Sequence, residues 1–540
     1  MISVVLHLLL AQEPSGSADQ ELFGDPPVPA PFEKLDTLCV DDWWNRPPSA
    51  IVETRVPRDE VIAFGIYTLA GTSLGLTAQL FPLYPDETRT VRLEVRADAE
   101  EEWGEIARRE VDDIGWATTF RIDDWDSSEG HQYRLLHGES ASFEGWIRPA
   151  PSVDQELVLG ALSCNSNQDR GARDGIVANL RRQDPDLVFF AGDQSYDHRQ
   201  HTAAWLAFGL QFRELFRDRP CITIPDDHDI GQGNVWGESG KVAELAGGAD
   251  GGYFHHPEYV RMVERAQTAH LPRPVDPEPV ERGIGVYFTR LRWGPVDFAI
   301  VEDRKFKSGP AGKIPQQGPR PDHIRDPNYD PASVDVEGLS LLGERQLAFL
   351  DSWGREPAPF KAVLSQTGFC GGAHLHGSVE NRLHADLDSN GWPQTGRNRA
   401  LAAIREAGAV HVAGDQHLAT VIQHGVETYR DGPWAFVVPA ICNDYYSRWW
   451  WPEDEAAGSG TRPEAPLPWT GDYLDGFGNR ITMHAYANPE SASAGAGYGL
   501  IRFAPASGLV TFECWPRDVD VSDPKAEQFP GWPITVDPRQ

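Results

Sequence analysis

One stretch of the chain places two potential metal ligands three residues apart. The apolar run from Leu187 to Phe190 is too short for a helix and predicts a buried strand, which Gly192-Asp193 follows. Tyr196 comes three residues after Asp193. A carboxylate is a hard oxygen ligand, whereas a phenol, with a pKa of about 10, binds a metal only when a strong Lewis acid deprotonates it. The pair therefore favours a trivalent metal, although a strand cap with a packed tyrosine gives the same local pattern.

Three other apolar segments end in the same way. Each has the length of a strand and leads directly to one or more side chains that bind metals. An acid-rich loop would explain the run of residues 226–229 alone, but not the recurrence of ligands at four strand ends. The ligands in these three segments are Cys164, Asp227 with His228, and Asp415 with His417.

The segments between these strands predict helices that join parallel strands. Residues 175–183 and 203–217 both carry apolar side chains at helical spacing. Parallel strands joined in this way place their carboxyl ends at the same edge of a sheet. Asp193 is the natural bridge between two cations, because one carboxylate can bind both. Two cations ~3.5–4 Å apart can activate water for an in-line displacement, so the pattern predicts a dinuclear metal hydrolase.

Further elements are expected between residues 231 and 406. The Gly-rich residues 231–252 predict a long loop over the site. Residues 285–288 and 296–301 predict a β-hairpin that ends just before Asp303-Arg304. The other expected elements are helices over 341–353 and 399–406 and a strand over 362–366.

Residues 386–391 match the first half of a calcium-binding EF-hand loop. The twelfth position of that loop is Arg397 instead of the glutamate that closes the calcium shell. We therefore expect an ordered loop near the site and not a complete EF-hand.

The chain divides into five expected parts. Residues 1–12 are apolar and end near a small residue, as in an export signal, although they contain no Lys or Arg. Such a signal predicts a secreted or periplasmic protein. Short strand-like runs at regular spacing predict an all-β sandwich in the next folded part. The five parts are a candidate signal peptide at 1–12, a linker at 13–39, an N-terminal β-sandwich at 40–150, a catalytic domain at 151–446 and a C-terminal extension at 447–540 packed on that domain.

The composition limits the partners of the protein. The 540 residues carry a net charge of −33, which argues against binding to nucleic acid or to an anionic membrane. Any anion-binding site must therefore supply its own local positive charge. No run of about 20 apolar residues follows the N-terminus, so no transmembrane helix is expected. The six cysteines form no Cys-x-x-Cys pair, which excludes a zinc ribbon; if Cys164 binds a metal, the other five can form at most two disulfides.

The spaced motifs resemble those of the calcineurin-like metallophosphoesterases and, within them, the PhoD-like alkaline phosphatase D family. The resemblance covers residues 157–446, and the Asp-x-x-Tyr element is also similar to that of purple acid phosphatases. It implies a four-layer α/β/β/α sandwich, preceded by an N-terminal all-β sandwich of the immunoglobulin or fibronectin kind. The motifs are Ser163-Cys164, Gly192-Asp193-x-x-Tyr196, Asp226-Asp227-His228-Asp229 and Gly414-Asp415-x-His417.

The resemblance also implies a centre that holds Fe³⁺ and Ca²⁺. Cys164 and Tyr196 would bind Fe³⁺ through a thiolate and a phenolate, and Asp193 would bridge to the second metal. Mn²⁺, Zn²⁺ and Mg²⁺ are alternatives for that second metal. Asp415 and His417 would complete the shell.

Three further residues have implied roles. Asp227 would be a ligand in the place where many family members have Asn, which adds one negative charge. His228 would lie near the leaving group, where it would orient the site or donate a proton if its pKa is near the working pH. Arg304 would hold the substrate phosphate.

The function implied by the resemblance is metal-dependent hydrolysis of phosphate mono- or diesters. Two alternatives stay open at this point. One is hydrolysis of another substrate, such as a nucleotide pyrophosphate or a sulfate ester, on the same scaffold. The other is a non-catalytic secreted protein with a structural metal centre.

Overall fold

The computed structural model describes residues 36–245, 247–373, 375–376, 378–443, 447–449, 467–487 and 493–539. The expected signal peptide and most of the expected linker lie outside the described residues. The last four linker residues are described, and Asp36 among them is buried, where its carboxylate accepts a hydrogen bond from Thr202 N at 2.6 Å.

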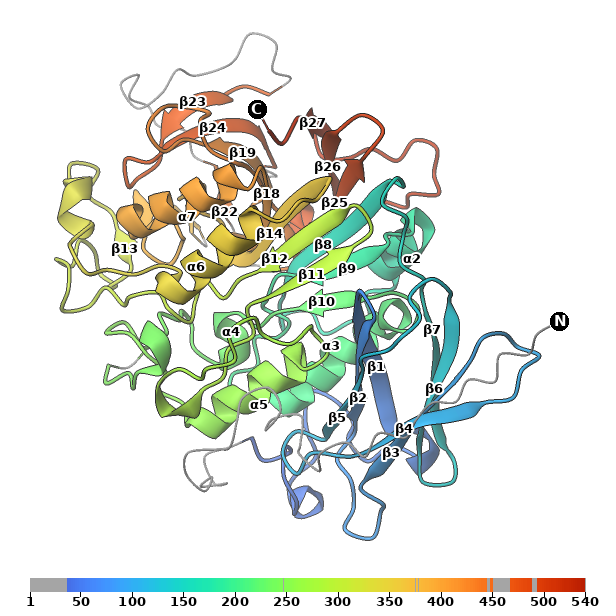
Figure 1. Cartoon of the computed structure of the whole chain (residues 1–540). Coiled ribbons are helices and arrows are strands. Elements are labelled where there is room, and N and C mark those ends of the chain that lie inside the picture. The colour runs from blue at the N-terminus through green and yellow to red at the C-terminus, as the bar shows by residue number, and fades with distance from the viewer. Residues whose placement is uncertain are drawn as a thin grey trace.

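Two antiparallel sheets form the N-terminal part of the molecule (Figure 1). The sheets pack face to face, since the Leu135 and Phe143 side chains of one sheet lie against Gly65 of the other. The three-stranded sheet consists of β1 (Ile62–Ala70), β2 (Ser73–Leu80) and β5 (Ala117–Ile122). The four-stranded sheet has the order β4 (Gly104–Glu110), β3 (Thr90–Arg96), β6 (His131–His137) and β7 (Ala141–Ile147).

The first mixed sheet carries three of the four predicted ligand strands. Strands β8 (Leu157–Asn165), β9 (Leu187–Phe190) and β10 (Cys221–Thr223) are parallel and entirely buried. An apolar residue at almost every position suits strands that are covered on both faces. The remaining strands are β21 (Ala440–Cys442), which pairs with β8, and the C-terminal β25 (Gly497–Ala504), β26 (Leu509–Pro516) and β27 (Ile534–Val536).

The second mixed sheet carries the fourth ligand strand, β18. Its strands β12, β14, β18 and β20 are parallel neighbours. The order is β11 (Thr289–Trp293), β12 (Val296–Ile300), β14 (Phe360–Thr367), β18 (Val410–Gly414), β20 (Trp434–Val437), β19 (Thr420–His424), β24 (Arg480–Tyr486) and β23 (Gly471–Leu474).

The two mixed sheets face one another and helices cover their outer faces (Figure 1). Aromatic rings join the sheets: Phe298 of β12 and Phe360 of β14 both contact Phe503 of β25, with centroids 6.2 and 5.6 Å apart. On the outer face of the second mixed sheet, α6 (Gly343–Gly354) and α7 (Gln394–Glu406) share a core with that sheet. On the outer face of the first mixed sheet lie α2 (Asp174–Gln183) and α3 (His201–Phe216). This arrangement confirms the four-layer α/β/β/α fold.

Helix α3 also joins the N-terminal sheets to the four-layer part. Its Phe208, Phe212 and Phe216 recur at four-residue spacing and all contact Phe190 of β9. Phe64 of β1 also packs against this helix, with its ring centroid 5.6 Å from the centroids of both Trp205 and Phe216. Aromatic side chains of one helix thus fix the N-terminal sheets to the sheet that carries the ligands.

Two details differ from the sequence expectation. The predicted strand at 285–288 is wrong, since the first strand of the hairpin is β11 at 289–293. The backbone N–H groups of Tyr287 and Phe288 donate to the Glu302 carboxylate instead of to a neighbouring strand. The described residues beyond 446 also supply strands to both mixed sheets, so they form part of the layers themselves.

The remaining helices and strands lie near the site and elsewhere in the molecule. Residues 231–252, expected as a loop, contain the 3₁₀-helix η4 (Glu238–Gly240). The described short helices and strands near this loop and elsewhere are α4 (Asp227–Ile230), α5 (Pro257–Thr268), η2 (Trp43–Asn45), η3 (Arg58–Glu60), η5 (Glu281–Gly283), η6 (Pro331–Val334), η8 (Ser493–Gly495), β13 (His323–Ile324), β15 (Leu375–His376), β16 (Ser378–Arg382), β17 (Ala385–Asp386) and β22 (Ser447–Arg448).

Candidate metal centre

The carboxyl ends of four buried strands bring the candidate ligands together. Cys164 lies at the end of β8, Asp193 follows β9, Asp227 opens α4 just after β10, and Asp415 follows β18. The structure thus joins residues that are as far as 251 positions apart in the chain. The edge where strands end is the place where α/β sheets bind ligands.

Asp229 fixes the loops after β9 and β10 relative to one another. Its carboxylate accepts hydrogen bonds from the backbone N–H groups of Asp193 at 2.8 Å, Ser195 at 3.2 Å and Asp226 at 3.0 Å. Burial raises the pKa of Asp229 to about 6, although these hydrogen bonds oppose the rise. Asp229 therefore positions the ligand loops and is not itself a candidate ligand.

Four candidate ligands have left-handed backbone conformations. The φ angles are 58° at Cys164, 58° at Asp193, 67° at Asp415 and 51° at His417. Only a few per cent of residues other than glycine adopt positive φ, and such strained positions gather at functional sites. The close packing beside Asp415 requires a glycine, because a Cβ at Gly414 would lie 2.0 Å from Ser163 Oγ.

A first group of ligand atoms consists of Cys164, Asp193 and His417, within 4.8 Å of one another. Tyr196 joins this group: its hydroxyl donates to Asp193 Oδ2 at 2.6 Å and lies 3.1 Å from His417 Nε2. Asn443, which follows β21, donates to the same hydroxyl at 2.9 Å. The group combines a thiol, a carboxylate, a phenol and an imidazole.

Burial governs the protonation of this first group. Desolvation and the nearby carboxylates Asp193 and Asp415 raise the pKa of Cys164 well above that of a free thiol. Desolvation and Asp193 likewise raise the pKa of Tyr196. Without a cation both groups are neutral, so only a strongly polarising metal would hold them as thiolate and phenolate.

A second group of ligand atoms consists mainly of carboxylates. Asp227 lies within 4.8 Å of Asp226 and Asp415 in one set and of Asp193 and His228 in another. Asp193 therefore belongs to both groups, as a bridging ligand would. Asp227 Oδ1 is buried and has no hydrogen-bond partner among the described residues. An oxygen of this kind is costly unless a cation or water satisfies it, so the residues fit a metal.

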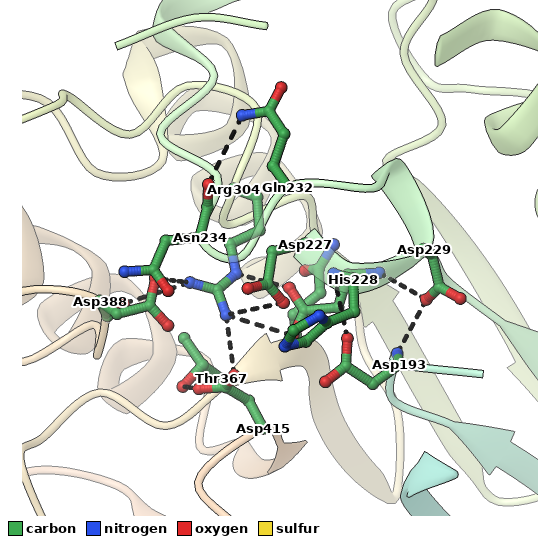
Figure 2. A network of polar contacts seen from close by, with 12 residues as sticks. Asp193, Asp227, His228, Asp229, Gln232, Asn234, Arg304, Thr367, Asp388 and Asp415 are labelled. Carbon is green, nitrogen blue, oxygen red and sulfur yellow. Dashed lines mark hydrogen bonds and ion pairs between the residues drawn. The ribbon is translucent and has the colours of Figure 1, made fainter. Parts of the chain in front are cut away.

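Arg304 lies inside the carboxylate group (Figure 2). Its Nε and Nη2 donate to Asp226 at 2.6 and 3.2 Å, its Nη1 donates to Asp388 Oδ1 at 2.6 Å, and Nη2 also donates to Asp415 at 2.9 Å. The side chain is only 4% exposed. Carboxylates thus contact each nitrogen of the guanidinium, which argues against the expected contact with the substrate phosphate; that role stays a prediction. Arg304 is a positioning residue.

His228 also differs from one of its expected roles. Its ring lies against that of Tyr196, with centroids 4.1 Å apart and planes tilted by 33°, and its Nδ1 lies 2.7 Å from His198 Nε2. Burial lowers the pKa of His228 to about 3, so the ring is neutral near pH 7. The condition for proton donation, a pKa near the working pH, is not met. A neutral ring at this place orients the site or binds a metal through its free electron pair.

A cavity of about 350 Å³ opens onto both groups of ligand atoms. Its wall includes Asp193, Tyr196, Asp227, His228, Asp415 and His417, together with residues that the sequence did not single out for this site. Of these, Asn443 directly follows an apolar strand and could have been found by the same signal as the ligands. Arg320 lies in a Gly- and Pro-rich loop that carries no such signal. The added wall residues include Ser166, Asn167, Arg320, Gln416 and Asn443, and the wall also includes Asn234, Asp386 and Asp388 from the loops expected near the site.

The loop expected from the half EF-hand motif lies at this cavity. Asp386 and Asp388 line the wall, and Asp388 pairs with Arg304. Arg397, which replaces the closing glutamate, instead donates to the backbone oxygens of Phe369 and Gly425. The loop is therefore ordered by its contacts with the site, as expected. All six cysteines lie in the described ranges, and all are buried and free of disulfides.

The layers and the grouped ligands define the metallophosphoesterase architecture. The model of the PhoD-like phosphatase family matches residues 209–448, which confirms the relation expected from the motifs. A structure of PhoD aligns with 89% of this chain and 91% of its own, with a TM-score of 0.59 at 15% identity. Purple acid phosphatase PPD1 from yellow lupin (Lupinus luteus) seeds aligns over 88% of this chain and 73% of its own, with a TM-score of 0.53 at 12% identity. A search of curated protein sequences finds no match.

None of the helices in the described ranges has the length and apolar character that crossing a membrane requires.

Proposed function

We propose that this protein is a metal-dependent phosphoric ester hydrolase that acts on phosphate mono- or diesters. The observation that carries the proposal is the arrangement of three sets of ligand atoms, linked through Asp193 and Asp227, around one cavity. The match to the PhoD-like phosphatase model supports the same activity. The open cavity favours catalysis over a purely structural metal centre, whose ligands would close the shell.

The chemistry of the donors suggests which metals the centre takes. Thiolate and phenolate donors at Cys164 and Tyr196 suit Fe³⁺, and the carboxylate group around Asp227 suits Ca²⁺, with Mn²⁺, Zn²⁺ or Mg²⁺ as alternatives. When bound, two such cations lower the pKa of water and neutralise charge on phosphoryl oxygens.

The residues of the chain have distinct tasks in this proposal. Asp193 holds both halves of the centre together. Arg304 orients Asp226 and Asp415 through the hydrogen bonds that it donates to them. Asn443 fixes the Tyr196 hydroxyl and the His417 ring through donated hydrogen bonds of 2.9 and 3.0 Å. Partners of this kind set the orientation of ligands and typically change metal affinity or activity by about 10- to 100-fold when removed.

Hydrolysis of an aryl phosphate and a bis-aryl phosphate, with and without chelator, tests the proposal. We expect turnover that the chelator abolishes, and a loss of more than about 100-fold in Asp193→Ala and Cys164→Ala. Cys514→Ala is the matched control, since it removes a buried thiol from β26, which does not line the cavity. Activity in Asp193→Ala equal to that of the parent protein would refute the assignment. A sulfate ester and a nucleotide pyrophosphate in the same panel separate the alternative substrates.

The visible spectrum tests the iron assignment separately. A Tyr196 phenolate bound to Fe³⁺ gives a charge-transfer band, which we expect in the iron-loaded protein and not in Tyr196→Phe. A band of equal strength in Tyr196→Phe would contradict this ligand.

We also propose that the protein is exported, to the periplasm or the medium, on the basis of the apolar residues 1–12. Fractionation of cells that express the full chain, with mass spectrometry of the mature N-terminus, tests this. Recovery of the uncleaved chain in the cytoplasm alone would contradict it.

A further inference from the structure

The charge of the cavity wall is unbalanced. Of the described residues that line it, five are aspartates, and Arg320 is the only lysine or arginine. With a net charge of −33, the protein repels an anionic substrate at long range. Arg304, the other arginine of the site, has no nitrogen available for a substrate. Among the described wall residues, any fixed positive charge offered directly to a substrate therefore comes from Arg320.

Arg320 is held in a fixed position beside the cavity. Its Nε and Nη2 donate to the two carboxylate oxygens of Asp322 at 3.2 and 2.9 Å. Asp322 is in turn fixed by Asn234, whose Nδ2 donates to Asp322 Oδ2 at 2.8 Å. Both Arg320 and Asn234 line the cavity. A guanidinium anchored along one edge in this way keeps its direction without help from a substrate.

One edge of the Arg320 guanidinium is still available. Within the described residues, Nη1 makes no hydrogen bond or ion pair, so both of its N–H groups can donate. The Arg320 side chain is 51% exposed, whereas that of Asp322 is 4% exposed. The metal ligands Asp193 and Asp227 are only 1% and 3% exposed. Arg320 thus belongs to the outer wall of the cavity and the ligand atoms to its floor.

We propose that Arg320 is a specificity-determining residue that binds a second anionic group on the organic part of the substrate. The phosphoryl group that reacts lies on the floor among the metal ligands, and the alcohol part extends toward the outer wall. A carboxylate or a further phosphate on that part accepts hydrogen bonds from Arg320 Nη1. The preferred substrates are then phosphate esters with an additional negative charge. This inference rests on the proposed function.

A matched pair of substrates tests the inference with the metal-loaded full chain. The pair is 4-carboxyphenyl phosphate and its methyl ester, 4-(methoxycarbonyl)phenyl phosphate, which differ in the charge of the carbonyl substituent. For the parent protein we expect kcat/KM about fivefold higher for the anionic member, the size of effect that a half-exposed ion pair supports. In Arg320→Gln we expect this ratio to fall by about fivefold, with most of the change in KM. Arg320→Lys retains part of the preference, since it keeps the charge but loses the planar geometry.

Two further variants separate charge recognition from other effects. Arg292→Gln removes the same charge from an exposed position of β11 outside the cavity, and we expect it to leave the ratio unchanged. Asp322→Asn weakens the anchor and should lower the ratio without abolishing it. The inference is overturned if Arg320→Gln keeps the kcat/KM ratio of the parent protein. It is also overturned if the variant slows hydrolysis of both substrates equally, because Arg320 would then contact the reacting phosphoryl group or serve only the fold. Absence of turnover for both substrates in the metal-loaded parent protein would instead refute the proposed function.

Discussion

Two neighbouring residues, Arg304 and Lys305, lie in buried clusters of opposite character. Arg304 lies among Asp226, Asp388 and Asp415, beside a cavity of about 350 Å³ whose wall the last two help to form. Lys305 Nζ lies 2.7 Å from both Glu264 and Glu302, beside a cavity of only about 10 Å³. Both clusters hold more carboxylates than cations. Only the first has room for anything larger than about one water molecule.

We call the Arg304 cluster, beside the larger cavity, the open cluster, and the Lys305 cluster the closed cluster. The two clusters balance their excess negative charge by different means. In the closed cluster, burial raises the pKa of Glu264 to about 7, with Glu302 adding to the rise, so that a proton neutralises one carboxylate below that pH. In the open cluster the buried Asp227 Oδ1 accepts no hydrogen bond, and Arg304 Nη2 lies 4.0 Å away from it. We propose that a metal supplies the missing charge there. The comparison indicates that an excess of buried carboxylates marks a metal site only where space accompanies it.

Replacement of the buried basic side chain in each cluster should have the largest effect on stability and should distinguish the two clusters. In chelated protein, Arg304→Met and Lys305→Met should each lower the free energy of unfolding by about 3–5 kcal/mol, because each leaves buried carboxylates unpaired. Added Ca²⁺ should restore stability to Arg304→Met, since a ligand that binds only the folded state stabilises it. Ca²⁺ should stabilise Lys305→Met only as much as it stabilises the parent protein, through the intact Arg304 cluster, so the difference in stability between these two proteins should remain. Urea unfolding with and without Ca²⁺ measures both effects.

The exposed pair between Arg399 and Glu344 provides the control for these variants. Both side chains are more than half exposed, so Arg399→Gln should change stability by less than about 1 kcal/mol. Equal rescue of the Arg304 and Lys305 variants by Ca²⁺ would mean that the two clusters do not differ as described.

The pH dependence of stability should report the proton in the closed cluster. Glu264 has a folded-state pKa of about 7 against an ordinary value of 4.5, so between these values the folded state binds a proton that the unfolded state has released. Stability from this group is therefore complete below about pH 4.5 and is lost as the pH rises through 7. Relative to Glu264→Gln, the parent protein should lose up to about 3 kcal/mol from pH 4.5 to 8.

Urea unfolding of both chelated proteins across this range measures the difference. Glu356→Gln removes an exposed carboxylate of the same type and serves as the control. Parallel pH profiles of the parent protein and Glu264→Gln would show that folding does not shift the pKa of Glu264.

The sequence predicts the ligands of the open cluster well, for a local reason. Each ligand directly follows an apolar strand, and parallel strands bring their ends together without any knowledge of the packing. Asp193 and Asp415 could therefore be placed from a few neighbouring residues. The alternation of apolar strands and helices likewise predicts the parallel strands, whereas the four layers were implied by the family resemblance.

The buried charges that residues distant in the chain place around a side chain could not be predicted in this way. The family resemblance led us to expect Arg304 at the substrate phosphate, and its sequence neighbours do not show that Asp226, Asp388 and Asp415 surround it. The strand expected at 285–288 was misplaced for a similar reason, since the distant Glu302 carboxylate accepts the N–H groups that a strand partner would otherwise accept. In both cases a buried charge, fixed by the tertiary structure, decides what the local pattern leaves open.

A pair of isosteric amide substitutions should produce the smallest effect and the sharpest comparison. Asp227→Asn keeps an oxygen ligand in the open cluster but removes one negative charge, so we expect affinity for the second cation to fall by about tenfold, because charge count tunes such sites. Activity at saturating metal should persist, since the amide oxygen still binds. Glu302→Gln makes the same chemical change in the closed cluster and should leave metal affinity unaltered. Isothermal titration calorimetry of both variants with Ca²⁺ measures these affinities. If Glu302→Gln weakens Ca²⁺ binding as much as Asp227→Asn does, then the total buried charge controls metal affinity and the presence of a cavity does not.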